Sequence, residues 1–87
     1  MNSPTLMKFP CDFPLKIMGM HTDEFRSLVL GIVQRHMGTI DESSIEERPS
    51  KNGKYLGLTV TVVPQSQEQL DNLYRELTSC DKVLVAL

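Results

Sequence analysis

The chain has 87 residues, and its 9 Lys and Arg against 11 Asp and Glu give a formal net charge of −2. That length fits one small domain rather than two. A 40% share of hydrophobic residues with a low net charge excludes a wholly disordered chain. Apolar runs are too short to cross a bilayer, and the slight acidity argues against a phosphate-binding surface as the main role. The first ten residues show no secretory pattern, so a cytoplasmic protein without membrane contact is expected.

The first half of the chain predicts an arm, a strand and a helix. Residues 1–12 contain prolines and no sustained period, which predicts a flexible N-terminal arm. Alternating apolar residues predict a strand over residues 13–20, with Gly19 placed for a bulge or a close backbone contact. Thr22 is then a good N-cap, and Gly38 a good C-cap, for a helix between them. The apolar stripe of this helix consists of Phe25, Leu28, Val29, Ile32, Val33 and His36.

The second half predicts a hairpin, another helix and a last strand. Residues 42–49 are acidic and predict an edge strand. The turn formers of residues 49–54, Asn-Gly among them, lead into an alternating strand over residues 55–63. Ser66 with Gln69 fits a capping box for the second helix. The apolar stripe of that helix consists of Leu70, Leu73, Tyr74 and Leu77. The apolar residues 83–87 then predict the last strand.

These elements follow one another as βαββαβ, the order of the ferredoxin-like α+β fold. Two right-handed crossovers around a hairpin give a four-stranded antiparallel sheet with strand order 4-1-3-2 and both helices on one face. Residues 13–87 are therefore expected to form a single domain whose other sheet face is open. Alternation along the two central strands puts our candidate contact residues for a partner or effector on that open face: Lys16, Met18, Tyr55, Thr59 and Thr61.

Four segments of the chain carry a family resemblance: FPCDFPLKIMG at 9–19, PSKNGKYLGLTVTV at 49–62, LYREL at 73–77 and DKVLVAL at 81–87. Together they resemble the YbeD-like family of small bacterial proteins of unknown function, over nearly the whole chain. The resemblance implies a fold similar to the ACT-like regulatory domains of amino-acid enzymes. It also implies a link to lipoate metabolism, because genes of the family often neighbour the octanoyltransferase of lipoate attachment. It carries over no catalytic residue.

The sequence offers no set of residues typical of catalysis or of metal binding. It lacks the common nucleophile, phosphate-loop, zinc and dinucleotide motifs. Cys11 and Cys80 could close a disulfide, but without a secretion signal reduced thiols are expected. His21 and His36 lie too far apart for one metal ion. His36 is expected to be a helix-face residue with a satisfied ring nitrogen, although a pocket holding it beside a carboxylate or Cys80 would favour an enzyme. We therefore expect no enzyme, no cofactor and no metal.

The sequence favours a small regulatory or adaptor domain that binds a protein partner or a small effector on its open sheet face. A homodimer formed through the sheet is one version of this prediction. The alternative is an RNA-binding module, because the same fold serves RNA-recognition motifs and residues 54–58 faintly resemble their third-strand signature. Stacking of RNA bases needs two or three exposed aromatic side chains. Only Tyr55 is predicted on the open face, which makes nucleic acid the less favoured partner.

Overall fold

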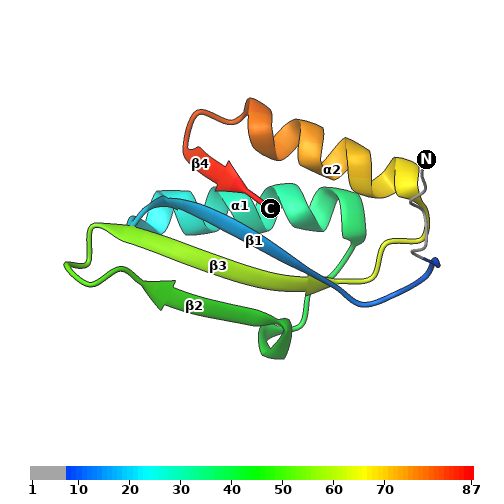
Figure 1. The fold of residues 1–87 in the computed structure, drawn as a ribbon, viewed down its shortest axis with the longest axis horizontal. Coiled ribbons are helices and arrows are strands. Elements are labelled where there is room, and N and C mark those ends of the chain that lie inside the picture. The colour runs from blue at the N-terminus through cyan, green and yellow to red at the C-terminus, as the bar shows by residue number, and fades with distance from the viewer. Residues whose placement is uncertain (1–7) are drawn as a thin grey trace.

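Strands and helices follow one another along the chain in the predicted order. The computed structural model describes residues 8–87. Its strands are β1 (Phe13–Met20), β2 (Ile45–Pro49), β3 (Tyr55–Val62) and β4 (Val83–Ala86), and its helices are α1 (Asp23–Met37) and α2 (Gln67–Ser79). The strands form one antiparallel sheet in the order β2-β3-β1-β4, with both helices on the same side (Figure 1). This is the predicted 4-1-3-2 order read from the opposite edge, and the ferredoxin-like fold is confirmed.

The hydrophobic core fills the space between the sheet and the two helices. Alternation buries one side of the central strands, where Leu15 and Ile17 of β1 face the helices. Four residues of the predicted α1 stripe are buried, namely Phe25, Val29, Ile32 and Val33. Leu28 was expected with them but remains 38% exposed, because it lies at the margin of the stripe. From α2 the buried residues are Leu70, Leu73 and Leu77.

Polar caps begin both helices where the sequence places them. The Oγ1 atom of Thr22 accepts a hydrogen bond from the backbone N–H of Phe25 at 3.0 Å. At the start of α2, the Oγ atom of Ser66 accepts one from the N–H of Gln69 at 3.1 Å. The reciprocal half of the predicted capping box is wrong, because the side-chain oxygen of Gln69 accepts from Gln65 N instead. The amide of Gln69 also donates to the carbonyl of His36 at 2.7 Å, which fixes its orientation between the helices.

The edge strand predicted over residues 42–49 begins three residues later than expected. Glu42–Ser44 form a short 3₁₀ turn, and β2 starts at Ile45. The backbone N–H of Ser44 donates to the carbonyl of Asp41 at 2.8 Å, and the Ser43 hydroxyl donates to the Asp41 carboxylate at 3.1 Å. Short polar side chains favour such local hydrogen bonds over a strand ladder, which explains the correction.

The N-terminal segment precedes the first strand. Residues 1–7 of the predicted arm lie outside the described part of the chain, and residues 8–12 form neither helix nor strand. Across residues 8–87 no helix combines the length and the apolar character needed to span a membrane.

Candidate binding groove on the open sheet face

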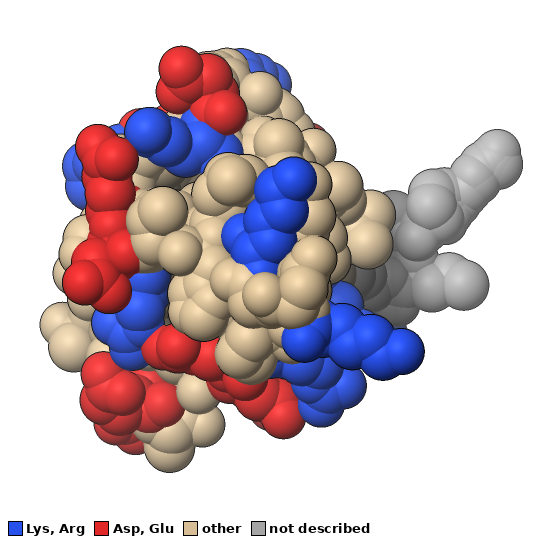
Figure 2. All heavy atoms as spheres, turned by 90° about the vertical axis from the view of Figure 1, so that its left-hand side faces the viewer, with Lys and Arg blue, Asp and Glu red and all other residues tan. Residues whose placement is uncertain are grey.

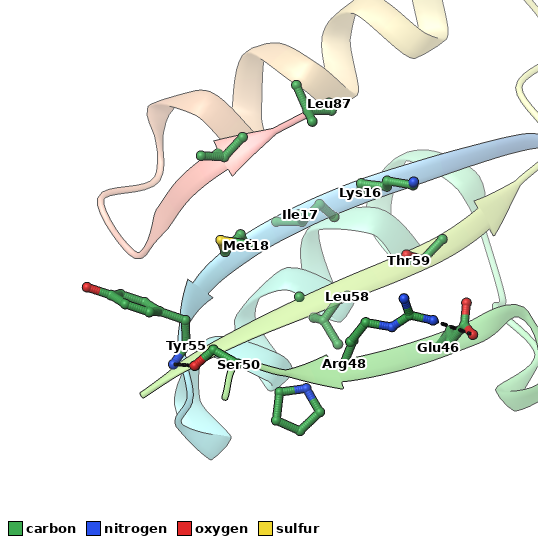
Figure 3. A pocket seen from close by; sticks show the side chains of 13 residues that line it. Lys16, Ile17, Met18, Glu46, Arg48, Ser50, Tyr55, Leu58, Thr59 and Leu87 are labelled. Atoms are coloured by element: carbon green, nitrogen blue, oxygen red, sulfur yellow. Dashed lines mark hydrogen bonds and ion pairs between the residues drawn. The ribbon is translucent and has the colours of Figure 1, made fainter. Parts of the chain in front are cut away.

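The sheet face opposite the helices carries a shallow groove. It has a volume of about 490 Å³ and is lined by residues from all four strands. The close-up in Figure 3 shows that the lining residues come from β1, β3 and β2, with β4 along one side. This volume lies within the range of about 300–1,000 Å³ that is typical of small-molecule sites. We call this surface the groove below.

Four of the five candidate residues from the sequence line the groove. Lys16 and Met18 come from β1, and Tyr55 and Thr59 come from β3. The fifth, Thr61, lies farther along β3 and lines a separate, smaller hollow of about 210 Å³. The structure therefore brings together Lys16, Met18, Tyr55 and Thr59 and leaves Thr61 outside.

The two edge strands add lining residues that the sequence reasoning did not select. Glu46 and Arg48 come from β2, and Val85 comes from β4 with Leu87 just beyond its end. The register pairs Glu46 with Thr59 and Arg48 with Gly57, so both β2 side chains point to the open face. Extending the alternation argument to β2 would have found Glu46 and Arg48. No comparable signal exists for β4, because a bulge interrupts its pairing with β1.

Gly57 makes the floor of the groove low at its centre. It pairs with Met18 of β1 on one side and with Arg48 of β2 on the other, and it has no side chain to fill the space between them. A Cβ atom built at Gly57 would meet only the carbonyl oxygen of Arg48, at an ordinary contact distance of 3.5 Å. The backbone thus tolerates a side chain here, and the groove owes its depth to the absence of one.

Tyr55 stands at the hairpin end of the groove. Its backbone N–H donates to the Ser50 hydroxyl at 3.0 Å, which ties the start of β3 to the turn after β2. The ammonium of Lys54 lies 5.4 Å from the centre of the Tyr55 ring, within the range of a cation–π contact. Among the lining residues from the described chain, Tyr55 supplies the one aromatic ring.

Acidic and basic side chains alternate around the hairpin end of the molecule. Figure 2 views this end, and blue and red side chains lie interspersed on it. Arg26 of α1 makes an ion pair with Glu47 and a looser one with Glu42 at 3.9 Å. Its hydrogen bond to Glu47 raises the pKa of the Arg26 guanidinium above its ordinary value. The acidic edge that follows from the sequence is therefore partly neutralised by a helix packed beside it.

His36 lies away from the groove, between the two helices. Its Nε2 atom is 2.7 Å from the Glu76 carboxylate of α2, which also pairs with Arg35. The ring nitrogen is thus satisfied by a carboxylate, and the contact joins the helices, but His36 does not line the groove. Cys11 and Cys80 are free thiols, as expected. Within residues 8–87 no group of three or more His, Cys, Asp or Glu side chains is placed to hold a metal ion.

Comparison with known proteins places this chain among small proteins of similar length. Residues 4–87 match the family described as "Protein of unknown function (DUF493)". A UPF0250 protein of Paraburkholderia phytofirmans is 48% identical over 95% of this chain and 93% of its own. The UPF0250 protein NMA1380 of Neisseria meningitidis serogroup A is also 48% identical, over 99% of this chain and 94% of its own. These matches confirm the family resemblance that the sequence segments indicated.

A solved structure supports the fold independently. The solution structure of protein HP0495 from H. pylori superposes with a TM-score of 0.75, over 100% of this chain and 94% of that one. The two sequences are only 19% identical. This similarity therefore supports the fold alone.

Proposed function

The chain belongs to the DUF493 family of proteins of unknown function, and because the family assigns no activity, we propose a function from the groove itself. The protein is a non-catalytic regulatory or adaptor domain that binds a small effector in the groove on its open sheet face. The observation that supports this proposal is the groove itself, a hollow of about 490 Å³ on the sheet face that the helices do not cover.

The groove combines two kinds of surface that small-molecule sites use. Met18 and Val85 are each 44% exposed and pair with each other across β1 and β4, so together they form a small apolar patch in the groove. Lys16, Arg48 and Thr59 provide charge and hydrogen-bond donors beside them. Apolar area supplies affinity and a few polar groups supply orientation, which is the composition expected of a binding site.

Retention of small molecules by groove variants tests this function. Gly57→Val should fill the groove without disturbing the strand, since its Cβ has room and β-branched residues fit strands. Thr61→Val is the matched control, because Thr61 lies on the same strand outside the groove. We expect the wild-type protein and Thr61→Val to retain a compound from a protein-free extract of the native cells, and Gly57→Val to retain at least tenfold less. The measurement is mass spectrometry after ultrafiltration. Equal retention by Gly57→Val would contradict the proposal.

A different partner on the same face would give a different experimental result. A protein partner, or a second copy of the chain forming a homodimer through the sheet, would be weakened by Met18→Asp and by Tyr55→Ala, while the small-molecule fraction retains nothing. An RNA partner would appear as retention of single-stranded RNA on filters at low salt. The link to lipoate metabolism and the cytoplasmic location stay predictions from the sequence.

A further inference from the structure

Gly57 lies at the centre of the groove, in the interior of a strand. Glycine weakens a strand, and it is found there at a bulge, at a sharp bend, or where another backbone or a ligand approaches closely. The pairing of Gly57 with Met18 and with Arg48 continues both ladders without interruption. The described glycines with a positive φ are Gly38 and Gly53, and a Cβ atom at Gly57 would have room. The fold itself gives no reason for glycine here, which leaves the approach of a ligand.

Four residues surround the open position above Gly57. Met18 and Arg48 are its partners across the sheet, and Figure 3 shows them on either side of β3. Tyr55 and Thr59 lie two residues before and after it, so strand alternation puts them on the same face. All four line the groove. We call this position the slot, because it has neighbours on four sides and a floor without a side chain.

The slot is wide enough for one flat ring. Neighbouring strands lie about 4.8 Å apart, so the Cβ atoms of Met18 and Arg48 are separated by about 10 Å across Gly57. Carbon atoms in contact lie about 3.5–4.0 Å apart, so a flat ring that touches both walls needs about 7–8 Å between them. Both wall side chains are long and unbranched, and they can close the difference by leaning inward.

The chemistry of the two walls favours an aromatic ring. The thioether of Met18 makes favourable contacts with aromatic rings, and this side chain is 44% exposed. A guanidinium such as that of Arg48 stacks on the face of a ring. Its contact with Glu46 is 3.7 Å long, which is beyond hydrogen-bond range, and the Arg48 side chain is 83% exposed. Arg48 is therefore free to turn over a ligand.

We propose that the slot binds the flat aromatic ring of a small molecule, an inference that rests on the proposed function and names its ligand class. The ring stands over Gly57, with one face toward the Met18 thioether and the other toward the Arg48 guanidinium. The rest of the molecule extends along the groove, where Val85 offers apolar surface and Thr59 offers a hydroxyl group.

Two neutral probes test the aromatic ring: 3-phenylpropionamide and 3-cyclohexylpropionamide. Each is titrated into ¹⁵N-labelled protein, and the Kd is taken from the shift of the Gly57 amide in NMR spectra. The cyclohexyl probe is the more hydrophobic, so apolar burial alone would favour it. We expect the phenyl probe to bind with a Kd at least about fivefold lower, because both walls attract a π face. Equal Kd values, or tighter binding of the cyclohexyl probe, would overturn the aromatic class.

Replacement of Arg48 separates its planar group from its charge. Arg48→Lys keeps the charge and removes the guanidinium, and it should raise the Kd of the phenyl probe about threefold while leaving that of the cyclohexyl probe unchanged. Arg35→Lys is the matched control on α1, where Arg35 pairs with Glu76 outside the groove. It should change neither Kd. An unchanged ratio of the two Kd values in Arg48→Lys would contradict stacking on the guanidinium.

Replacement of Gly57 tests whether this residue serves the ligand or the fold. Gly57→Ala should abolish the saturable shifts with the phenyl probe and should unfold at the same or a higher urea concentration than the wild type. Gly31→Ala, in α1 with open space around a built Cβ, should bind the probe as the wild type does. Wild-type binding by Gly57→Ala would overturn the slot, and earlier unfolding would show that the fold itself requires this glycine.

Failure of this inference is distinguishable from failure of the proposed function. Groove amides that move with neither probe would overturn the ligand class. A compound that the wild type retains from the cell extract and that Gly57→Val loses would still support the groove as a binding site. Retention of no compound, together with unmoved amides, would overturn both.

Discussion

Gly19 shows how one residue joins three elements of this fold. It lies on β1 next to the bulge, where a Cβ atom would sit 2.6 Å from the carbonyl oxygen of Lys82 and would overlap the ring of Phe25. Phe25 is 1% exposed in the core, and the Lys82 carbonyl belongs to the backbone before β4. Neither neighbour can move without disturbing α1 or the edge of the sheet, so only glycine fits this position.

Substitution of Gly19 should therefore destabilise the protein. We expect Gly19→Ala to lower the free energy of unfolding by about 1–3 kcal/mol through overpacking. Gly31→Ala is the control, because Gly31 lies within α1 with no atom within 4 Å of a built Cβ, and it should stabilise the protein by about 1 kcal/mol. Urea unfolding followed by circular dichroism measures both. A Gly19→Ala protein as stable as the wild type would show that the packing at this site is looser than described.

At the scale of whole elements, the two edge strands differ in the features that discourage pairing with another chain. β2 carries Glu46, Glu47 and Arg48 and ends in Pro49, all features that discourage pairing with another chain. β4 is apolar, and its pairing shifts register because Leu84 has no partner on β1. A β-bulge increases the local twist of an edge strand, and this twist also discourages pairing with another chain. It also sends Val85 to the groove, while Val83 and Ala86 pack against the core.

The start of α1 gives a prediction at the same scale. The Thr22 hydroxyl satisfies the Phe25 N–H, one of the four donors that a helix start leaves without a partner. We expect Thr22→Ala to lower the free energy of unfolding by about 1 kcal/mol, and Thr22→Ser to keep it close to the wild-type value. Urea unfolding of the two variants side by side measures the difference. Identical midpoints for Ala and Ser at this position would contradict the role of the cap.

For the whole molecule, the fold was predictable because its signals were local and mutually consistent. The signals are the alternation in residues 13–20 and 55–63, the two amphipathic helices and the Asn-Gly turn. Together they agree on one topology, the βαββαβ order. The start of β2 was not predictable from alternation, since the hydrogen bonds of Asp41 compete with strand formation. This error moved the start of β2 by three residues and left the order of the elements intact.

The groove was predictable only in its central part. The register of β1 against β3 brings Lys16 next to Thr59 and follows directly from alternation. Alternation extended to β2 would also have found Glu46 and Arg48, whereas the position of Val85 depends on the bulge of β4, which a single sequence does not reveal. Arg48 of β2 and Val85 of β4 complete the lining of the groove on its two sides. The central part of the groove was therefore foreseeable, but its full lining required the structure.

The methyl group of Met18 offers the most direct test of the groove as the binding site. Met18 lines the groove, whereas Met37 lines the smaller hollow and serves as an internal control. With ¹³C-methyl methionine in the protein, and the Met18 resonance identified by its loss in Met18→Leu, a complete extract of the native cells is added. We predict that the Met18 resonance shifts, that Met37 stays in place, and that Gly57→Val abolishes the shift. An unmoved Met18 resonance, in an extract that contains both the small molecules and the proteins of the cell, would contradict the assignment of function to this face.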